Sequence, residues 1–155
     1  MVRQLYFEAH LQLAKTNENL NSFDKAVDSY HEAIRINPDN ISTHFDLGLA
    51  YLNLSQFDNA VSSFDNVLEL QPEYPEAFYQ KGLAYFQKGE SLINKEDQVG
   101  DMTDAYEKSK NAFADAIKQN AEYFDAHYNR SLANYKLEKF NDVISDCDEA
   151  IKIDD

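Results

Sequence analysis

Apolar side chains recur at three- and four-residue intervals along most of the sequence, the spacing that places them on one face of an α-helix. Residues 33–38 and residues 67–72 both end in proline, which has no N–H to donate and so prevents a helix from continuing. The 155 residues include only 4 glycines and 3 prolines, too few for the many turns of a β-sandwich or barrel. The pattern therefore predicts an all-α chain.

A six-residue phrase recurs at an interval of about 34 residues between its first two copies. It stands at residues 22–27, 56–61 and 139–144. Each copy reads as a turn, a phenylalanine, a short polar residue and the start of an amphipathic helix. Short side-chain oxygens can accept the free N–H groups of a first helical turn, so we expect the polar residues to be N-caps. These expected caps are Asp24, Asp58 and Asn141.

Small residues also recur in register, where the two helices of each hairpin would cross. They are Ala14, Gly48, Gly82 and Ser131. Close approach of two helices requires small side chains at the contact, so this spacing has a packing reason of its own.

Together, the repeated phrase, the terminal prolines and the small crossing residues resemble the tetratricopeptide-repeat (TPR) family over nearly the whole chain. The resemblance implies a right-handed α-solenoid of antiparallel helix hairpins, the TPR superhelix, forming a single domain over residues 1–155. The four repeats are expected at residues 7–40, 41–74, 75–123 and 124–155. Apolar residues continue to the end of the last amphipathic helix, so we expect the domain to belong to a longer chain.

The third repeat contains an insertion at about residues 91–105, which predicts an extended helical hairpin. We expect a break near residues 97–100 and a helix restarting with Asp101 as its N-cap. A calcium loop aligned on Gly100 would begin at Lys95 and close at Tyr106, which excludes an EF-hand. The tip is either a second contact surface or an inert extension whose apolar residues pack on each other. Its candidate residues are Leu92, Ile93, Val99 and Met102.

Some positions depart from the family pattern. Lys81 and Arg130 stand where a buried leucine is usual, a position represented by Leu13 and Leu47. Their long stems can cover apolar surface while the charge reaches water. Two asparagines, Asn17 and Asn134, replace the tyrosine seen at Tyr51 and Tyr85. Cys147 aligns with Tyr30, Phe64 and Phe113, so we interpret it as a small buried apolar residue.

The resemblance places the first helix of each repeat on the concave face. The candidate groove residues there are Leu11, Phe45, Asp46, Leu49, Leu52, Glu76, Tyr79, Gln80, Leu83, Phe86, Asp125, Tyr128, Leu132 and Tyr135. An apolar and aromatic floor with acidic edges suits a peptide or amphipathic helix that carries hydrophobic anchors and Lys or Arg flanks. The alternative is that these aromatics only pack between repeats.

Charge narrows the range of partners. The sequence has 14 Lys and Arg against 28 Asp and Glu, a formal net charge of -14, which disfavours nucleic acid and anionic membranes and favours a basic protein partner. The family's carboxylate clamp holds the acidic tail of a heat-shock chaperone with Lys, Asn and Arg. Its positions here are Leu11, Lys15, Asp46, Glu76 and Gln80, or, one repeat later, Phe45, Leu49, Gln80, Asp125 and Asn129. Acidic side chains at these positions would repel a carboxylate tail, so we expect no such partner.

Nothing in the sequence indicates an enzyme. It has no phosphate-binding glycine loop and no nucleophile elbow. His10, His44 and His127 occupy equivalent repeat positions, too far apart to share a metal, so we expect no metal and no cofactor. We expect a soluble cytoplasmic adaptor that binds another protein. The alternatives are an assembly subunit that self-associates through its last helix or inserted hairpin, and a regulatory domain of a larger enzyme.

Overall fold

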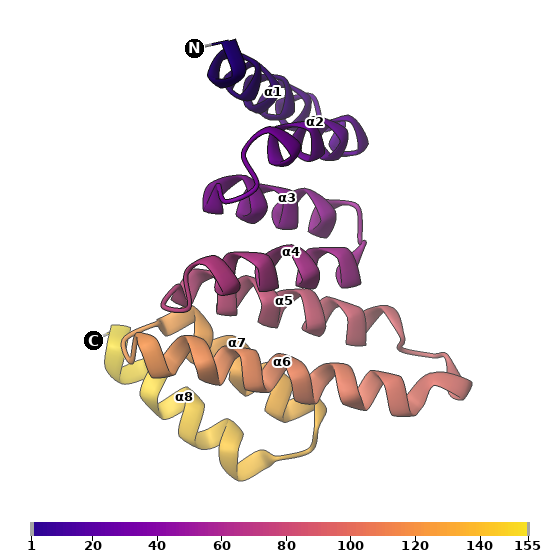
Figure 1. Cartoon of the computed structure of the whole chain (residues 1–155). Helices are drawn as coiled ribbons and strands as arrows, with labels where there is room; N and C mark the ends of the chain where they lie inside the picture. Colours follow the sequence, from indigo (N-terminus) through magenta and orange to yellow (C-terminus); the bar gives the residue numbers. More distant parts are fainter. Residues whose placement is uncertain (1, 155) are drawn as a thin grey trace. The chain divides into compact units, whose positions relative to one another are not determined.

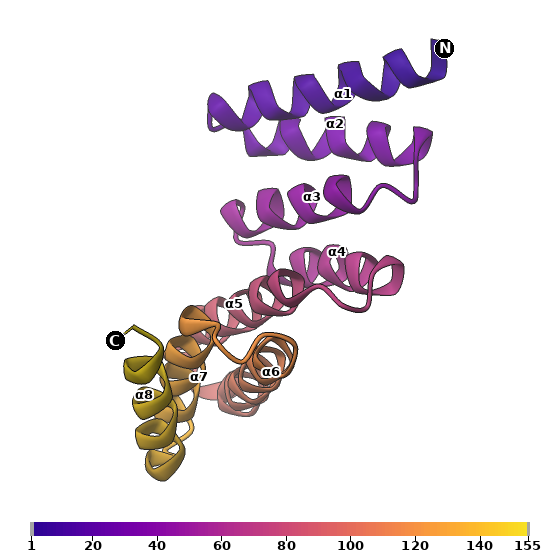
Figure 2. The same ribbon diagram turned by 90° about the vertical axis from the view of Figure 1, so that its left-hand side faces the viewer.

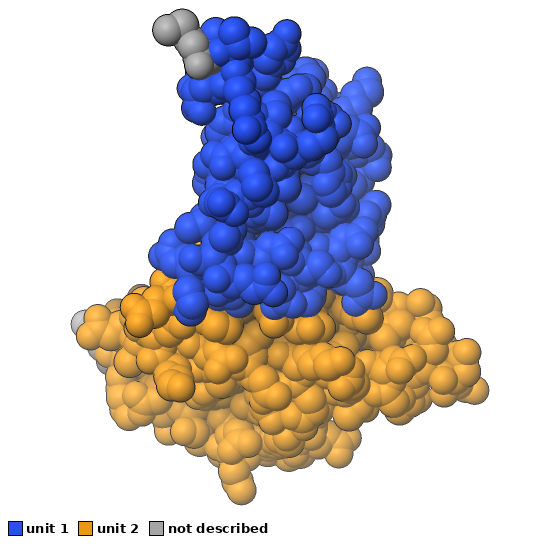
Figure 3. Space-filling model, viewed as in Figure 1, with its two compact units in different colours: residues 1–72 blue, residues 73–155 orange. Residues whose placement is uncertain are grey.

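The computed structural model describes residues 2–154, which form eight α-helices and one short 3-10 helix and contain no strand. The chain divides into two compact units, residues 1–72 and residues 73–155 (Figure 3). The N-terminal unit contains α1 (Val2–Asn19), α2 (Phe23–Ile36), α3 (Ile41–Asn53) and α4 (Phe57–Leu70). The C-terminal unit contains α5 (Pro75–Ser91), η1 (Glu96–Gln98), α6 (Val99–Gln119), α7 (Phe124–Lys136) and α8 (Phe140–Asp154).

Within each unit, every helix packs mainly on the helices next to it in the sequence (Figures 1 and 2). Helices α1 and α2, α3 and α4, α5 and α6, and α7 and α8 form four hairpins. The predicted all-α solenoid of helix hairpins is confirmed. As expected, α2 ends two residues before Pro38 and α4 ends two residues before Pro72.

The hairpins are held together by aromatic rings that pack on small residues. A Cβ atom added at Gly48 would lie 2.6 Å from the ring of Phe64, and one added at Gly82 would lie 2.6 Å from the ring of Phe113. Both rings are fully buried. In the first hairpin, Ala14 and Tyr30 belong to one buried cluster. The small crossing residues therefore let each ring fill the space between two helices.

The expected N-caps are wrong: the N-caps of α2 and α4 are Ser22 and Gln56, two residues before Asp24 and Asp58. Helices α2, α4 and α8 begin at the phenylalanine of each phrase, so Asp24, Asp58 and Asn141 lie second in the helix. A carboxylate there still interacts favourably with the helix N-terminus, because the first turn carries partial positive charge. A side-chain cap is present on α3, where Asn40 Oδ1 accepts a hydrogen bond from the Thr43 N–H at 2.9 Å.

Two expectations of burial are also wrong. Leu13 is 50% exposed, whereas the equivalent Leu47 is buried in a cluster with Tyr30 of α2. The difference arises because no helix within residues 2–154 precedes α1 and packs on it as α2 packs on α3. Cys147 is half-buried rather than buried.

The insertion lengthens both helices of the third hairpin, as predicted. Helix α5 has 17 residues and α6 has 21, against 13 in α3 and 14 in α4. In Figure 1 the end of α5 and the start of α6 run past the ends of α7 and α8. Helix α6 begins at Val99 after the short η1, so Asp101 lies in its first turn and is not the N-cap. Gly89 repeats the crossing seen at Gly82, since a Cβ atom there would lie 2.7 Å from the Tyr106 ring.

The turn inside three hairpins uses one backbone geometry. Asn21, Ser55 and Glu138 have φ of 53°, 56° and 59°, the left-handed region that glycine adopts most readily. The following residue donates its N–H to a carbonyl five positions back in each case, as in Lys139 to Asn134 at 2.9 Å. None of the three turns contains glycine.

Glu138→Gly should therefore stabilise the protein. Glycine relieves the strain of the left-handed conformation at residue 138, and this relief outweighs the extra freedom of glycine in the unfolded chain. We expect the free energy of unfolding to rise by about 0.5–1 kcal/mol. Urea unfolding followed by circular dichroism measures the change. Glu138→Ala retains the strain and should gain almost nothing, and a loss of stability in the glycine variant would contradict the assignment.

Candidate functional site

Every residue of the predicted groove lies at the surface or half-buried, and none belongs to the buried core. The half-buried residues are Leu11, Phe45, Asp46, Leu49, Leu52, Tyr79, Gln80, Leu83, Phe86 and Leu132. The exposed residues are Glu76, Asp125, Tyr128 and Tyr135. We call the five in the N-terminal unit, Leu11 to Leu52, the N-terminal patch, and those from Glu76 to Tyr135 the C-terminal patch.

The N-terminal patch joins apolar side chains of α1 and α3 to one carboxylate. The ring of Phe45 packs edge-on against the buried ring of Phe64, with 5.6 Å between their centroids. Partial burial raises the pKa of Asp46, and Lys15 opposes this only in part. Asp46 forms no ion pair with any residue in the described part of the chain. This patch therefore presents hydrophobic area beside an unneutralised negative charge.

The C-terminal patch contains a connected set of polar and aromatic groups from α5 and α7. Tyr123, just before α7, donates its hydroxyl hydrogen to Glu76 Oε2 at 2.7 Å. Its ring lies 5.0 Å from that of Tyr79, centroid to centroid. Asn129 Nδ2 donates to the Tyr79 hydroxyl oxygen at 3.2 Å and to the Asp125 carbonyl at 2.8 Å. These bonds fix Tyr123 on the Glu76 carboxylate and Tyr79 on Asn129, and the nearby charge of Asp125 acts on both tyrosines.

The pKa values of Tyr79 and Tyr123 reflect the negative charge of the C-terminal patch. Burial, followed by the charges of Asp125 and Glu76, raises the pKa of Tyr79. Burial and the hydrogen bond to Glu76 raise the pKa of Tyr123. Glu76 and Asp125 form no ion pair with any of residues 2–154. A cation brought here would meet carboxylates that are not already neutralised.

The remaining aromatics of the C-terminal patch are also in contact with other rings. Phe86 lies 5.5 Å from the ring of buried Tyr106, and Tyr79 lies 5.7 Å from that of Phe113. These two rings thus contribute to packing inside the unit as well as to its surface. Tyr128 and Tyr135 are exposed and each lies beside a neighbouring phenylalanine, Phe124 or Phe140.

The tip of the third hairpin exposes Ile93 and Val99, while Leu92 and Met102 are half-buried. Polar contacts tie its base to α7. Tyr106 donates to Glu90 Oε1, and Lys136 Nζ lies 2.7 Å from the same oxygen. Partial burial alone would raise the pKa of Glu90, but the bonds from Lys136 and Tyr106 lower it overall. The lengthened hairpin is therefore fixed against α7 rather than free at its base.

Known proteins share both the repeat and the arrangement of helices. The sequence matches the family model of the TPR repeat twice, at residues 19–55 and 53–89. The solved structure of MamA aligns with 96% of this chain at a TM-score of 0.80, 22% identity and 73% coverage of MamA. Residues 19–89 therefore carry tetratricopeptide repeats, and 96% of the chain shares the fold of MamA.

Two other solved TPR structures share the fold. TTC0263 of Thermus thermophilus aligns with 95% of this chain, at a TM-score of 0.70 and 19% identity, over 74% of its own length. The first TPR domain of Spaghetti (RPAP3), bound to the HSP90 peptide SRMEEVD, aligns with 86% of this chain, at a TM-score of 0.69 and 18% identity, over 94% of its length. No curated protein sequence matches the chain.

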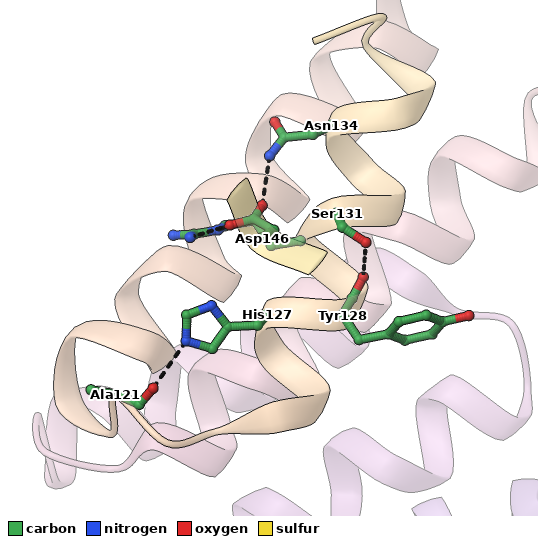
Figure 4. Close-up of polar contacts among 7 residues, drawn as sticks. Ala121, His127, Tyr128, Ser131, Asn134 and Asp146 are labelled. Carbon is green, nitrogen blue, oxygen red and sulfur yellow. Dashed lines mark hydrogen bonds and ion pairs between the residues drawn. The ribbon is translucent and has the colours of Figure 1, made fainter. Parts of the chain in front are cut away.

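In the α7–α8 hairpin, the departures from the repeat pattern meet in one polar network (Figure 4). The Asp146 carboxylate, on α8, is buried at the α7–α8 crossing. Arg130 donates to Asp146 Oδ1 through Nε at 3.0 Å and through a terminal nitrogen, and Asn134 Nδ2 donates to Oδ2 at 2.9 Å. Arg130 therefore neutralises the charge of Asp146, and Asn134 adds a further hydrogen bond to the same carboxylate. The network pairs the buried Asp146 charge inside the hairpin, while Asn134 Oδ1 is buried without a hydrogen-bond partner.

Two of the recurring histidines fasten the loops that precede their helices. His44 donates from Nε2 to the Pro38 carbonyl at 2.7 Å, and His127 donates to the Ala121 carbonyl at 3.0 Å (Figure 4). Both rings are buried. Within residues 2–154, no group of three or more His, Cys, Asp or Glu side chains is arranged to hold a metal ion, and no helix is long and apolar enough to cross a membrane.

Sequence reasoning missed the polar contacts of Tyr123, at the surface of the C-terminal patch, and of Asp146, which is buried. The signal for Asp146 was present, since a carboxylate stands where the equivalent positions of the other hairpins have Ser29, Ser63 and Ala112. Tyr123 lies outside the repeated phrase, so nothing in the repeat pattern predicts its bond to Glu76.

Asp46→Asn should stabilise the N-terminal unit at neutral pH. The raised pKa means that the folded state holds the Asp46 proton more tightly than the unfolded state, so ionisation of Asp46 opposes folding. The stabilising contribution of protonation is complete below the ordinary aspartate pKa of about 3.9 and is lost as the pH rises through the raised value. The urea midpoint of the variant should exceed that of the wild type at pH near 7 and converge with it at pH near 3. A gain that persists in acid would contradict this assignment.

Proposed function

We propose that this protein is an adaptor that binds a peptide or amphipathic helix of a partner protein, and that the bound segment combines hydrophobic side chains with Lys or Arg. The observation that carries the proposal is the C-terminal patch. Two carboxylates without ion-pair partners flank tyrosine rings that are only half-buried. Burial of aromatic side chains supplies binding energy, and the carboxylates select positive charge.

The peptide bound by the RPAP3 domain supports a protein partner but not the same peptide chemistry. That peptide, SRMEEVD, carries three acidic residues near its end. In the first alignment of the clamp this chain has Asp46 and Glu76 with Lys15 as the single cation, and in the second alignment it has Asp125 and no cation. Like charges would repel such a tail, so a basic segment is favoured.

Selection of short random peptides displayed on phage tests the proposal. We expect ligands in which large apolar residues are interleaved with Lys or Arg. Recovery of acidic peptides, or of none, would contradict it.

Tyr79→Ala should then weaken the binding of a selected peptide by about 2 kcal/mol, roughly 30-fold. Phe86→Ala should also weaken it, because both rings are proposed anchors of the C-terminal patch. Calorimetric titration of the folded variants measures the loss. Tyr85→Ala is the matched control, since it removes a half-buried tyrosine of the same helix that lies outside the patch. Equal affinity in Tyr79→Ala and Tyr85→Ala would exclude Tyr79 as an anchor.

A second candidate function is self-association, which α8 favours. Its surface exposes Phe140, Ile144 and Ile151, with Ile144 61% exposed. The acidic residues Asp148 and Glu149 lie beside them in the sequence. The N-terminal unit offers a complementary hollow of about 740 Å³, which is lined by Val2, Arg3, Tyr6, His10, Arg35 and Ile36. Light scattering should detect a concentration-dependent oligomer that Ile144→Glu abolishes, and a monomer at all concentrations would exclude this function.

A further inference from the structure

The contact between one hairpin and the next occurs once within each unit. In the N-terminal unit α2 lies between α1 and α3 and packs on both (Figure 2), and in the C-terminal unit α6 packs on α7. Tyr30 of α2 belongs to one buried cluster with Leu47 and Ala50 of α3. At the equivalent positions of α6 and α7, Phe113 and Ala133 are fully buried. We call this arrangement the hairpin junction.

Helix α8 exposes the face that α2 uses in the hairpin junction. The residues of α8 that stand at the positions of Val27, Tyr30 and Ile34 are Ile144, Cys147 and Ile151. Ile144 is 61% exposed and Ile151 is 60% exposed, whereas their counterparts in α2 are half-buried. Helix α8 packs mainly on α7, so within residues 2–154 this face of α8 remains largely uncovered.

Helix α1 exposes the opposite face of the same junction, the one that α3 presents to α2. The residues of α1 that stand at the positions of Leu47, Ala50 and Tyr51 are Leu13, Thr16 and Asn17. Leu13 and Thr16 are exposed, whereas Leu47 and Ala50 are buried. Tyr6 and His10, which line the hollow of the N-terminal unit, continue this face toward the start of α1 at helical spacing.

The two exposed faces depart from the internal junctions in complementary ways. Both internal junctions combine an aromatic ring with an alanine, as in Tyr30 with Ala50. In α8 the ring is replaced by the smaller Cys147, and in α1 the alanine is replaced by the larger Thr16. Either change alone would leave a gap or cause a clash, but the two volumes compensate when these faces meet.

The polar positions at the edge of the junction also match. In the N-terminal unit, His31 Nε2 of α2 lies 2.8 Å from the Tyr51 hydroxyl oxygen of α3. Helix α8 has Asp148 in place of His31, and α1 has Asn17 in place of Tyr51. An amide N–H donates to a carboxylate, so this pair can form a hydrogen bond as well. The α8 face and the α1 face of one chain thus fit each other in volume and in hydrogen bonding.

We propose that α8 of one copy packs on α1 of a second copy in the register of the hairpin junction. The contact places Ile144, Cys147 and Ile151 of one copy against Leu13 and Thr16 of the other. This inference goes beyond the adaptor function, and it rests on the second candidate function, self-association, for which it names the two faces. Because the faces differ, the contact is heterologous, and a pair of copies retains one free face of each kind. Further copies therefore add until a ring closes or the concentration limits growth.

Mixing two variants of the whole chain tests the contact. Leu13→Glu places a charge on the α1 face and Ile151→Glu places one on the α8 face, and both positions are exposed, so both variants should fold. An unpaired charge buried at the contact opposes association, so each variant alone should self-associate at least about tenfold more weakly than the wild type. Their equimolar mixture should form a heterodimer, because one intact face of each kind remains.

Light scattering over a range of concentrations measures these assemblies. The matched control is Val99→Glu, which introduces the same charge at an exposed apolar position of the hairpin tip and should leave self-association unchanged. A mixture of Leu13→Glu and Ile151→Glu that stays monomeric would overturn the proposal. Loss of self-association in Val99→Glu would also overturn it, because the hairpin tip would then form the contact.

Crosslinking tests the register. The chain has a single cysteine, Cys147. In the variant Thr16→Cys, a short bis-maleimide should join position 16 of one copy to Cys147 of another, and mass spectrometry of the joined peptides identifies the link. Glu8→Cys is the matched control, because it lies exposed on the same helix two turns away and should not be joined. A link between two Cys147 side chains in the wild type would show a symmetric contact of two α8 helices and overturn the register.

The outcomes separate this contact from self-association and from the adaptor function. Loss of self-association in Ile151→Glu but not in Leu13→Glu would retain self-association through α8 and remove its pairing with α1. A wild type that stays monomeric at every concentration would remove both. The peptide selection tests the adaptor function and does not depend on either result.

Discussion

Replacing Arg130 with methionine is expected to lower the free energy of unfolding of the C-terminal unit by about 3–5 kcal/mol. The variant keeps an apolar stem of similar length but removes the guanidinium that donates to Asp146. The Asp146 side chain is only 4% exposed, so its charge would stay buried with a single bond from Asn134. Hydrogen exchange of amides in α7 and α8 measures the loss. A change below about 1 kcal/mol would show that water replaces the guanidinium.

The second repeat supplies the control, because it fills the same three positions without charge. Leu47, Tyr51 and Ser63 stand where the fourth repeat has Arg130, Asn134 and Asp146. The triple variant R130L/N134Y/D146S should recover most of the lost stability, to within about 1.5 kcal/mol of the wild type, because no buried charge remains. If the triple variant is as unstable as Arg130→Met, the cost comes from altered packing and not from the unpaired carboxylate.

Phe113→Ala should destabilise the same unit by about 3–5 kcal/mol. The Phe113 ring is fully buried, lies against the backbone at Gly82 and contacts the ring of Tyr79. Its removal leaves a cavity between α5 and α6 that glycine cannot fill. Because Tyr79 loses its support, binding of the selected peptide should weaken as well, even where the unit remains folded.

The control for Phe113→Ala is Tyr135→Ala, which removes an aromatic ring from the exposed surface of the same unit. Its effect on the free energy of unfolding should stay within about 0.5 kcal/mol. Urea unfolding followed by circular dichroism compares the two. Similar losses in both variants would show that the core of this unit is not organised around Phe113.

The helices and their order could be predicted from the sequence because they depend on local rules. Proline after residues 37 and 71 stops a helix wherever it occurs, and small residues at Gly48 and Gly82 permit close crossing in any helical hairpin. The N-caps could not be placed as reliably. A carboxylate such as Asp24 or Asp58 stabilises a helix N-terminus both at the N-cap and at the second residue of the helix. The sequence pattern does not distinguish these two positions.

The polar networks could not be predicted because they depend on which helix faces are brought together. Arg130 and Asn134 were each identifiable as departures, but Asp146, on the next helix, bonds them only because α7 and α8 cross there. Likewise, Tyr123 bonds Glu76 beside Tyr79, and although the equivalent loop before α5 also ends in Glu-Tyr, at residues 73–74, the sequence does not show which helix the Tyr123 hydroxyl reaches. The composition predicted an acidic surface. Which Asp and Glu side chains form no ion pair with Lys or Arg of the same chain depends on how the helices pack.

Binding of a basic, hydrophobic partner segment by the C-terminal patch is the central proposal for this protein. Backbone amide shifts of the chain, titrated with a selected peptide, test this most directly. We expect the largest shifts at residues 76–86 and 123–135, with small changes elsewhere in the C-terminal unit. Shifts confined to the hairpin tip at residues 92–102, or to α8, would contradict the proposal and place the interaction on a different face of the protein.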